Sequence, residues 1–165
     1  MPAKVKSKWN SSGDLEFKTL AGAEVATLDA ANGILRGAGI ARNIRSRFTI
    51  AQVNAGATIL PAVAGRKYRL IDVLGIAVGG AAGAVTTVDV LGTQGASGVK
   101  LAAFAQASLT QSTVLRPGVA GTAVLADGAS FVQNDVNTAL TIGKTGSSVT
   151  TATHIDVILT YALEE

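Results

Sequence analysis

Apolar and polar residues alternate along most of the chain after residue 46, with the period of two that is typical of β-strands. The longest alternating segment is Lys67–Val78, in which five large apolar residues share one parity: Tyr68, Leu70, Leu74, Ile76 and Val78. Ile71 and Val73 fall on the other parity. A strand that carries apolar residues on both parities is predicted to be buried on both faces.

Six shorter segments after residue 46 also have strand patterns, namely 48–53, 58–63, 85–92, 99–109, 137–144 and 154–163. Segment 99–109 is ambiguous because its alanines also fit a helix, and we favour a strand. Pro61 places segment 58–63 at a sheet edge, since proline cannot donate a ladder hydrogen bond. The whole pattern predicts an all-β fold, with a β-sandwich or jelly-roll-like domain over residues 46–165.

Residues 1–45 have a different pattern, with short alternating segments at 14–17 and 24–29 and turn residues at Ala21-Gly22 and Asn32-Gly33. We predict an extended N-terminal arm that contains a small β meander. Residues 36–47, with Gly37 and Gly39, are interpreted as a connector. The arm has too little apolar mass for a core of its own, so its apolar side chains need another surface to lie on.

Composition favours self-association. The chain is 48% hydrophobic but has only seven aromatic residues and 19 glycines, so each buried side chain removes little area from water. The strands predicted at 67–78 and 154–163 also need cover on both faces. A thin core of this kind often gains stability from subunit contacts, and we expect a homotrimer.

The positive charge lies at the front of the chain. Residues 1–47 carry eight cations and four anions, whereas the remaining 118 residues carry six cations and seven anions. A basic arm can bind nucleic acid or an acidic protein surface, or it can be a solvated leader. The cations are dispersed and stacking aromatics are few, so we expect no nucleic-acid partner. The uncharged run at residues 73–88 has 16 residues and contains glycines, so no membrane span is expected.

The sequence offers little catalytic or metal-binding chemistry. Cysteine is absent, histidine occurs once, and the carboxylates are scattered without a calcium-loop spacing, so we expect no metal and no cofactor. His154 and Asp156 would share one strand face, but no Gly-x-Ser-x-Gly elbow supplies a nucleophile. The chain is therefore predicted not to be an enzyme. The basic cluster Gly65-Arg66-Lys67-Tyr68-Arg69 is either a solvated strand end or an electrostatic contact with a partner.

Both ends of the chain contain short sequence segments that resemble those of small structural proteins of tailed bacteriophages. These segments lie at residues 7–9, 13–17 and 22–33, and again at 125–131, 140–146 and 151–157. The group includes capsid decoration, or cement, proteins: trimers of a β domain that stand on the shell while N-terminal arms grip neighbouring subunits. The resemblance implies the major capsid protein as partner, synthesis in the host cytoplasm and a final place on the capsid surface of the virion. A secondary contact with a host surface is left open.

The candidate capsid-binding residues all lie in the arm. They are Lys4, Lys6, Lys8, Trp9, Leu15, Phe17, Val25 and Leu28. A large aromatic such as Trp9 in a segment without a core is interpreted as an anchor for a partner's groove. The alternative function is a receptor- or glycan-binding β-sandwich head of a tail or head fibre. Scattered aromatics argue against it, because sugar binding uses stacking platforms.

Overall fold

The computed structural model describes residues 5–22, 24–29, 34–36, 41–116, 124–125 and 134–164. The chain divides into two units, Met1–Ile40 and Ala41–Glu165, which we call the N-terminal unit and the roll. The roll thus begins before the expected boundary at residues 45 and 46. The reason is that β5 (Arg42–Thr49) already pairs with the last strand of the chain from Arg42 onward. Residues 42–47 of the predicted connector therefore belong to a strand.

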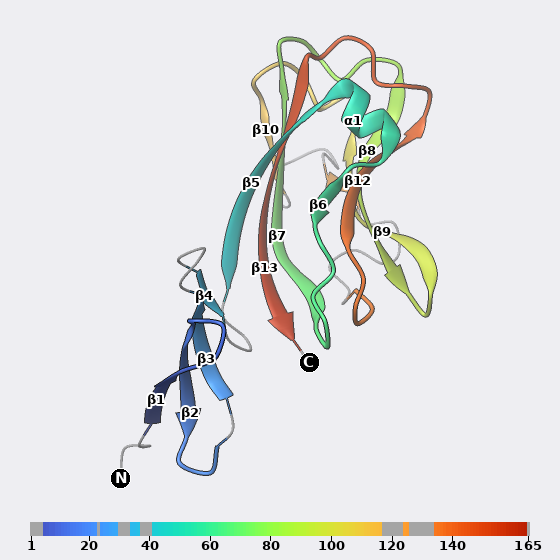
Figure 1. Ribbon diagram of the computed structural model, residues 1–165. Helices are drawn as coiled ribbons and strands as arrows, with labels where there is room; N and C mark the ends of the chain where they lie inside the picture. The colour runs from blue at the N-terminus through green and yellow to red at the C-terminus, as the bar shows by residue number, and fades with distance from the viewer. Residues whose placement is uncertain are drawn as a thin grey trace. The chain divides into compact units, whose positions relative to one another are not determined.

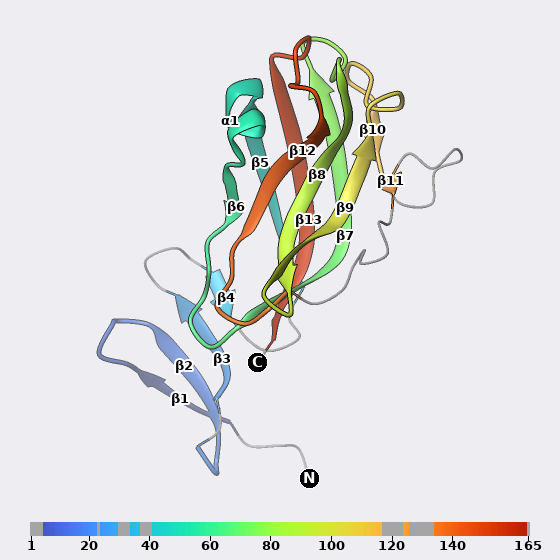
Figure 2. The ribbon, with the colours of Figure 1, turned by 90° about the vertical axis from the view of Figure 1, so that its right-hand side faces the viewer.

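The roll is a sandwich of two antiparallel sheets (Figures 1 and 2). The first roll sheet has the order β10 (Val114–Leu115), β7 (Lys67–Val78), β13 (His154–Glu164), β5. The second roll sheet has the order β11 (Val124–Leu125), β9 (Ser97–Ala105), β8 (Val85–Gln94), β12 (Leu140–Gly146), β6 (Thr58–Leu60). The predicted all-β sandwich is confirmed, and the ambiguous segment 99–109 is a strand up to Ala105.

The strand pairing is that of a jelly roll. Strands pair in a nested series, β5 with β13, β6 with β12, β7 with β10 and β8 with β9. β13 also pairs with β7, and β12 with β8, so the nested strip is wound into two facing sheets. Two Greek keys wound in this way define the eight-stranded jelly roll. β11 adds a short strand beside β9.

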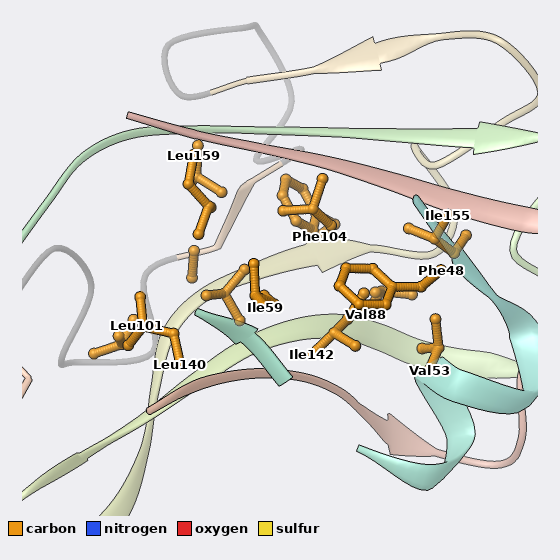
Figure 3. Close-up of a cluster of buried hydrophobic side chains, with 14 of the residues drawn as sticks. Phe48, Val53, Ile59, Val88, Leu101, Phe104, Leu140, Ile142, Ile155 and Leu159 are labelled. Carbon is orange, nitrogen blue, oxygen red and sulfur yellow. The ribbon is translucent and has the colours of Figure 1, made fainter. Parts of the chain in front are cut away.

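Side chains from both sheets meet between them and form one core (Figure 3). Phe104 of β9 is its largest fully buried residue. Its ring lies against Gly75 of β7, since a Cβ built on Gly75 would be 2.8 Å from two ring carbons. Because a glycine on one sheet makes room for an aromatic ring on the other, the two sheets approach closely at this point.

A bulge changes which parity of β7 faces the core. Asp72 pairs with Thr160, but the next pair joins Leu70 to Tyr161, so Ile71 is an extra residue. The inward parity therefore changes from Leu70 to Val73. The expectation that this strand is buried on both faces is wrong at Ile71, which is 48% exposed.

The segment predicted as a strand at 48–53 is largely helical. α1 (Ile50–Ala55) follows β5 and leads to β6, so it connects the two sheets at one end of the roll (Figure 1). Thr49 and Gln52 form a capping box, and Gly56 closes the helix with a φ of 78°. Val53 faces the core and is fully buried. The helix caps and the burial of Val53 thus outweigh the strand propensity of the β-branched residues in this segment.

The N-terminal unit contains one antiparallel sheet, a meander in the order β1 (Val5–Trp9), β2 (Leu15–Thr19), β3 (Glu24–Asp29), β4 (Ile34–Arg36). The small meander predicted for this region is present, and its β2–β3 turn uses Gly22 with a φ of 91°. The predicted Asn32-Gly33 turn lies outside the described residues. No helix in the described ranges is long and apolar enough to cross a membrane.

Candidate functional site

The register of the N-terminal sheet brings its large apolar residues together. Trp9 of β1 lies opposite Leu15 of β2, and Leu15 lies opposite Leu28 of β3. Phe17, two residues further along β2, lies opposite Ala26. Residues directly opposite each other in antiparallel strands project from the same face, and residues two apart on a strand do too. These five side chains therefore make one face, which we call the apolar face.

The lysines predicted to act with these residues lie on the opposite face. Lys6 is opposite Lys18, and Lys8 is opposite Glu16. Lys18 and Glu16 form an ion pair at 2.7 Å, and this contact, with a hydrogen bond from Asn10, lowers the pKa of Glu16. The predicted surface is thus divided by the sheet into an apolar face and a charged face. Lys4 lies outside the described residues.

The apolar face is exposed at Trp9 and partly exposed along the rest of the sheet. Trp9 is 61% exposed, Leu15, Phe17 and Leu28 are half-buried, and Ala26 is buried. Among the described residues of this unit there is a single sheet and no helix, so no second layer packs on it. Val25 is 45% exposed and is the extra residue of a bulge in β3, because Phe17 pairs with Ala26 while Lys18 pairs with Glu24. Alternation alone therefore does not assign Val25 to either face.

The turn next to Trp9 is held by the side chain of Asn10. Its Oδ1 accepts the backbone N–H groups of Ser12 and Asp14, both at 2.9 Å. Its Nδ2 donates to Glu16, and Gly13 adopts a φ of 83°. An asparagine that bonds the backbone two residues on is a standard turn device. The loop thus fixes the end of β1 from which Trp9 projects.

A second charged cluster lies on the outer face of the first roll sheet. Asp156 of β13 is fully buried there and accepts two hydrogen bonds from Arg47, at 2.7 and 2.9 Å, and one from Arg45. Arg47 lies opposite Asp156 in the register, and Arg45 lies opposite Ile158. The bonds from Arg47, with the smaller contribution of Arg45, lower the pKa of Asp156 to about 2, although burial acts in the opposite direction. The side chains of Arg45 and Arg47 remain 59% and 52% exposed, respectively.

This cluster removes the one acid–base pair that the sequence offered. His154 shares the outward parity of Asp156, as expected, but the Asp156 carboxylate is occupied by Arg45 and Arg47. The His154 ring bonds Thr153 through Nδ1 at 3.2 Å. No group of three potential metal-ligating side chains occurs in the described ranges. In the described part of the chain, therefore, His154 and Asp156 do not form an acid–base pair.

Comparison of the chain with models of known protein families gave no match. Searches of the curated proteins and of the solved structures gave none either.

Proposed function

We propose that the chain is a structural protein of a tailed-phage head, which binds the outer surface of the capsid as a homotrimer and stabilises the shell. The N-terminal sheet is the docking element and the jelly roll is the body that stands on the surface. The observation that carries the proposal is the uncovered apolar face, on which an exposed Trp9 lies in one row with Leu15 and Leu28.

The apolar face has the features of a binding hot spot. A tryptophan side chain buries roughly 150–250 Å² when fully covered. With 61% of Trp9 exposed, about 90–150 Å² remains for a partner to cover, worth about 2–4 kcal/mol at about 25 cal/mol per Å². Hot spots of protein interfaces are enriched in tryptophan and surrounded by apolar contacts that exclude water. Leu15 and Leu28 supply such contacts beside Trp9.

A single-layer sheet is suited to lie on another protein. A lone small sheet is marginally stable in water unless its apolar face packs on something. Docking on a capsid subunit supplies that second layer, while the opposite face keeps Lys6, Lys8 and the Lys18–Glu16 pair in water. The surplus positive charge of this face steers the sheet toward an acidic surface and acts mainly on the association rate.

The aromatic residues of the roll favour this role over glycan binding. Tyr68 and Tyr161 form an edge-to-face pair with ring centroids 5.5 Å apart, and they are 3% and 9% exposed. The Tyr68 hydroxyl donates to the carbonyl of Pro61. These rings are structural, so in the described part of the roll no tyrosine provides a platform on which a sugar can stack.

The test is occupancy on decoration-free heads, titrated with purified protein. Trp9→Ala should weaken binding about 30-fold or more, the equivalent of about 2 kcal/mol. Leu20→Ala is the matched control, because Leu20 is 55% exposed in the same unit but lies in the β2–β3 turn. It should stay within about threefold of the wild type, the effect expected of a surface substitution. Equal occupancy by the wild type and Trp9→Ala would overturn the proposed docking element.

The charged face is tested separately with Lys6→Ala/Lys8→Ala. This variant should bind more slowly at low salt, and the difference should shrink as salt rises, because exposed charges are screened over about 10 Å at 0.1 M. A loss of affinity that does not depend on salt would mean that the charged face, and not the apolar face, lies against the shell.

A further inference from the structure

The outer face of the first roll sheet has an aliphatic stripe that the described part of the roll leaves uncovered. It consists of Leu74 and Ile76 on β7, Val114 opposite Ile76 on β10, and Ile158 opposite Leu74 on β13. Val114 is 48% exposed and the other three are half-buried. Within the roll, no described strand or helix packs over this stripe (Figures 1 and 2).

The edge of the same sheet is positively charged. β5 is the edge strand, and Arg45 and Arg47 project from it on the outer face. Together with Asp156 they form a cluster of net charge +1. Their three hydrogen bonds to Asp156 use three of the ten N–H donors of two guanidinium groups. The remaining donors are available to an acceptor outside the cluster, and Asp156 holds both arginines in position to bind one.

The stripe ends at a carboxylate. Asp72 of β7 lies opposite Thr160, on the outward side of the bulge at Ile71. Its Oδ1 accepts the backbone N–H of Val73 at 2.9 Å, and Asp72 takes part in no ion pair among the described residues. The outer face is therefore asymmetric. It is positive along its β5 edge, whereas β7 carries the aliphatic residues and the carboxylate between Asp72 and Ile76. Beyond the bulge, Arg69 of β7 is also exposed on this face, where it forms an ion pair with Glu164 of β13 at 2.7 Å.

This asymmetry favours a head-to-tail contact between copies of the chain. A symmetric contact of two β5 edges would bring Arg45 and Arg47 against their own counterparts, which like-charge repulsion opposes. A contact that repeats by rotation joins two different patches and closes into a ring. In such a ring the β5 edge of one copy would lie against the stripe of the next, where Arg45 would meet Asp72.

We propose that the homotrimer is built through this contact, with the arginine edge of β5 covering the aliphatic stripe of the neighbouring copy and Arg45 pairing with that copy's Asp72. The inference rests on the trimer of the proposed function and specifies its interface. It also gives a role to the buried Asp156, which positions Arg45 and Arg47 at the seam between copies.

The absence of native cysteine makes the face directly testable in the full-length chain. Val114→Cys places one thiol on the stripe, and Thr58→Cys places one at an exposed position on the edge strand of the other sheet. Light scattering without any capsid present first confirms that both variants form trimers like the wild type. In these trimers the thiol of Val114→Cys should react with a maleimide at least tenfold more slowly than that of Thr58→Cys. Equal labelling rates in a trimer would show that another surface makes the contact.

The proposed Arg45–Asp72 contact is tested by reversing the charge of Asp72 and then removing the charge of Arg45. Asp72→Arg should raise the dissociation constant of the trimer at least tenfold, whereas Thr58→Arg, the same new charge on the other sheet, should leave it unchanged. Adding Arg45→Ala to Asp72→Arg should recover part of the loss, because it removes the repelling partner. Circular dichroism checks that each variant is folded. No recovery in the double variant, with folding intact, would overturn the Arg45–Asp72 pairing.

The outcomes separate this inference from the proposed function. A wild-type chain that is monomeric at micromolar concentration, yet binds heads through Trp9, would overturn the interface and leave docking intact. A trimer with a protected Val114→Cys thiol that shows no binding to heads would support the interface and overturn the docking proposal.

Discussion

Protonation of Asp156 is expected to destabilise the roll at acidic pH. The group has a pKa of about 2 in the folded chain, against the ordinary value of 3.8. A carboxyl group whose folded pKa is depressed contributes stability above its unfolded pKa and loses that contribution as the pH falls through the folded pKa. The loss should therefore run from about pH 4 down to about pH 2.

The difference between the two pKa values sets the size of the effect. It is slightly less than two units, and each unit corresponds to 1.36 kcal/mol, so Asp156 contributes about 2 kcal/mol to the free energy of unfolding at neutral pH. Asp156→Asn removes this contribution at every pH. Its additional cost is small, since Arg45 and Arg47 are more than half exposed and can return to water.

The assay is urea unfolding of the wild type and Asp156→Asn at pH 6, 4, 3 and 2, followed by far-ultraviolet circular dichroism. Trp9 fluorescence is unsuitable because this residue lies in the N-terminal unit. The wild type should be about 2 kcal/mol more stable than the variant at pH 6, and the gap should close toward pH 2. A gap that stays constant over this pH range would refute the argued coupling between Asp156 and the two arginines.

Three further predictions concern the packing and the local structure. Gly75→Ala should lower the free energy of unfolding by about 1–3 kcal/mol because its Cβ would meet the Phe104 ring, and Phe104→Leu in the same chain should recover part of this loss, as measured by urea unfolding. Thr49→Ala should cost about 1 kcal/mol by removing the cap of α1, which thermal unfolding would detect. Asn10→Ala should weaken binding to heads several-fold while sparing the roll, because the turn beside Trp9 loses the acceptor of two backbone bonds.

The strands of the roll were predictable where alternation runs long enough. The predicted bounds of β7, Lys67–Val78, are the observed ones, because large apolar residues recur at even positions from Tyr68 to Val78, with the exception of Asp72. The bulge at Ile71 was not predictable, because it depends on the register with β13, which no local pattern encodes. α1 was missed because six residues are too few to show helical periodicity, although Thr49, Gln52 and Gly56 together carried a capping signal that could have been used.

The candidate site was predictable in its residues but not in its arrangement. Trp9 and Phe17 stand out as large aromatics in a segment without a core, whereas their common face depends on pairing between three strands. The separation of Lys6 and Lys8 from Trp9 does follow from alternation within β1, and strand parity would have indicated it. Arg45 was assigned to a connector, so its pairing with the buried Asp156 of β13 could not be foreseen.

Trp9 itself provides the most direct test of the docking proposal, because it is the only tryptophan of the chain. It can be replaced biosynthetically by 5-hydroxytryptophan, which is excited selectively over the tryptophans of the capsid. In the free protein this residue should be quenched readily by acrylamide, as a 61% exposed ring should be. On decoration-free heads its emission should shift to the blue and quenching should fall at least threefold. Unchanged emission and quenching on fully occupied heads would show that Trp9 stays in water and would contradict docking through the apolar face.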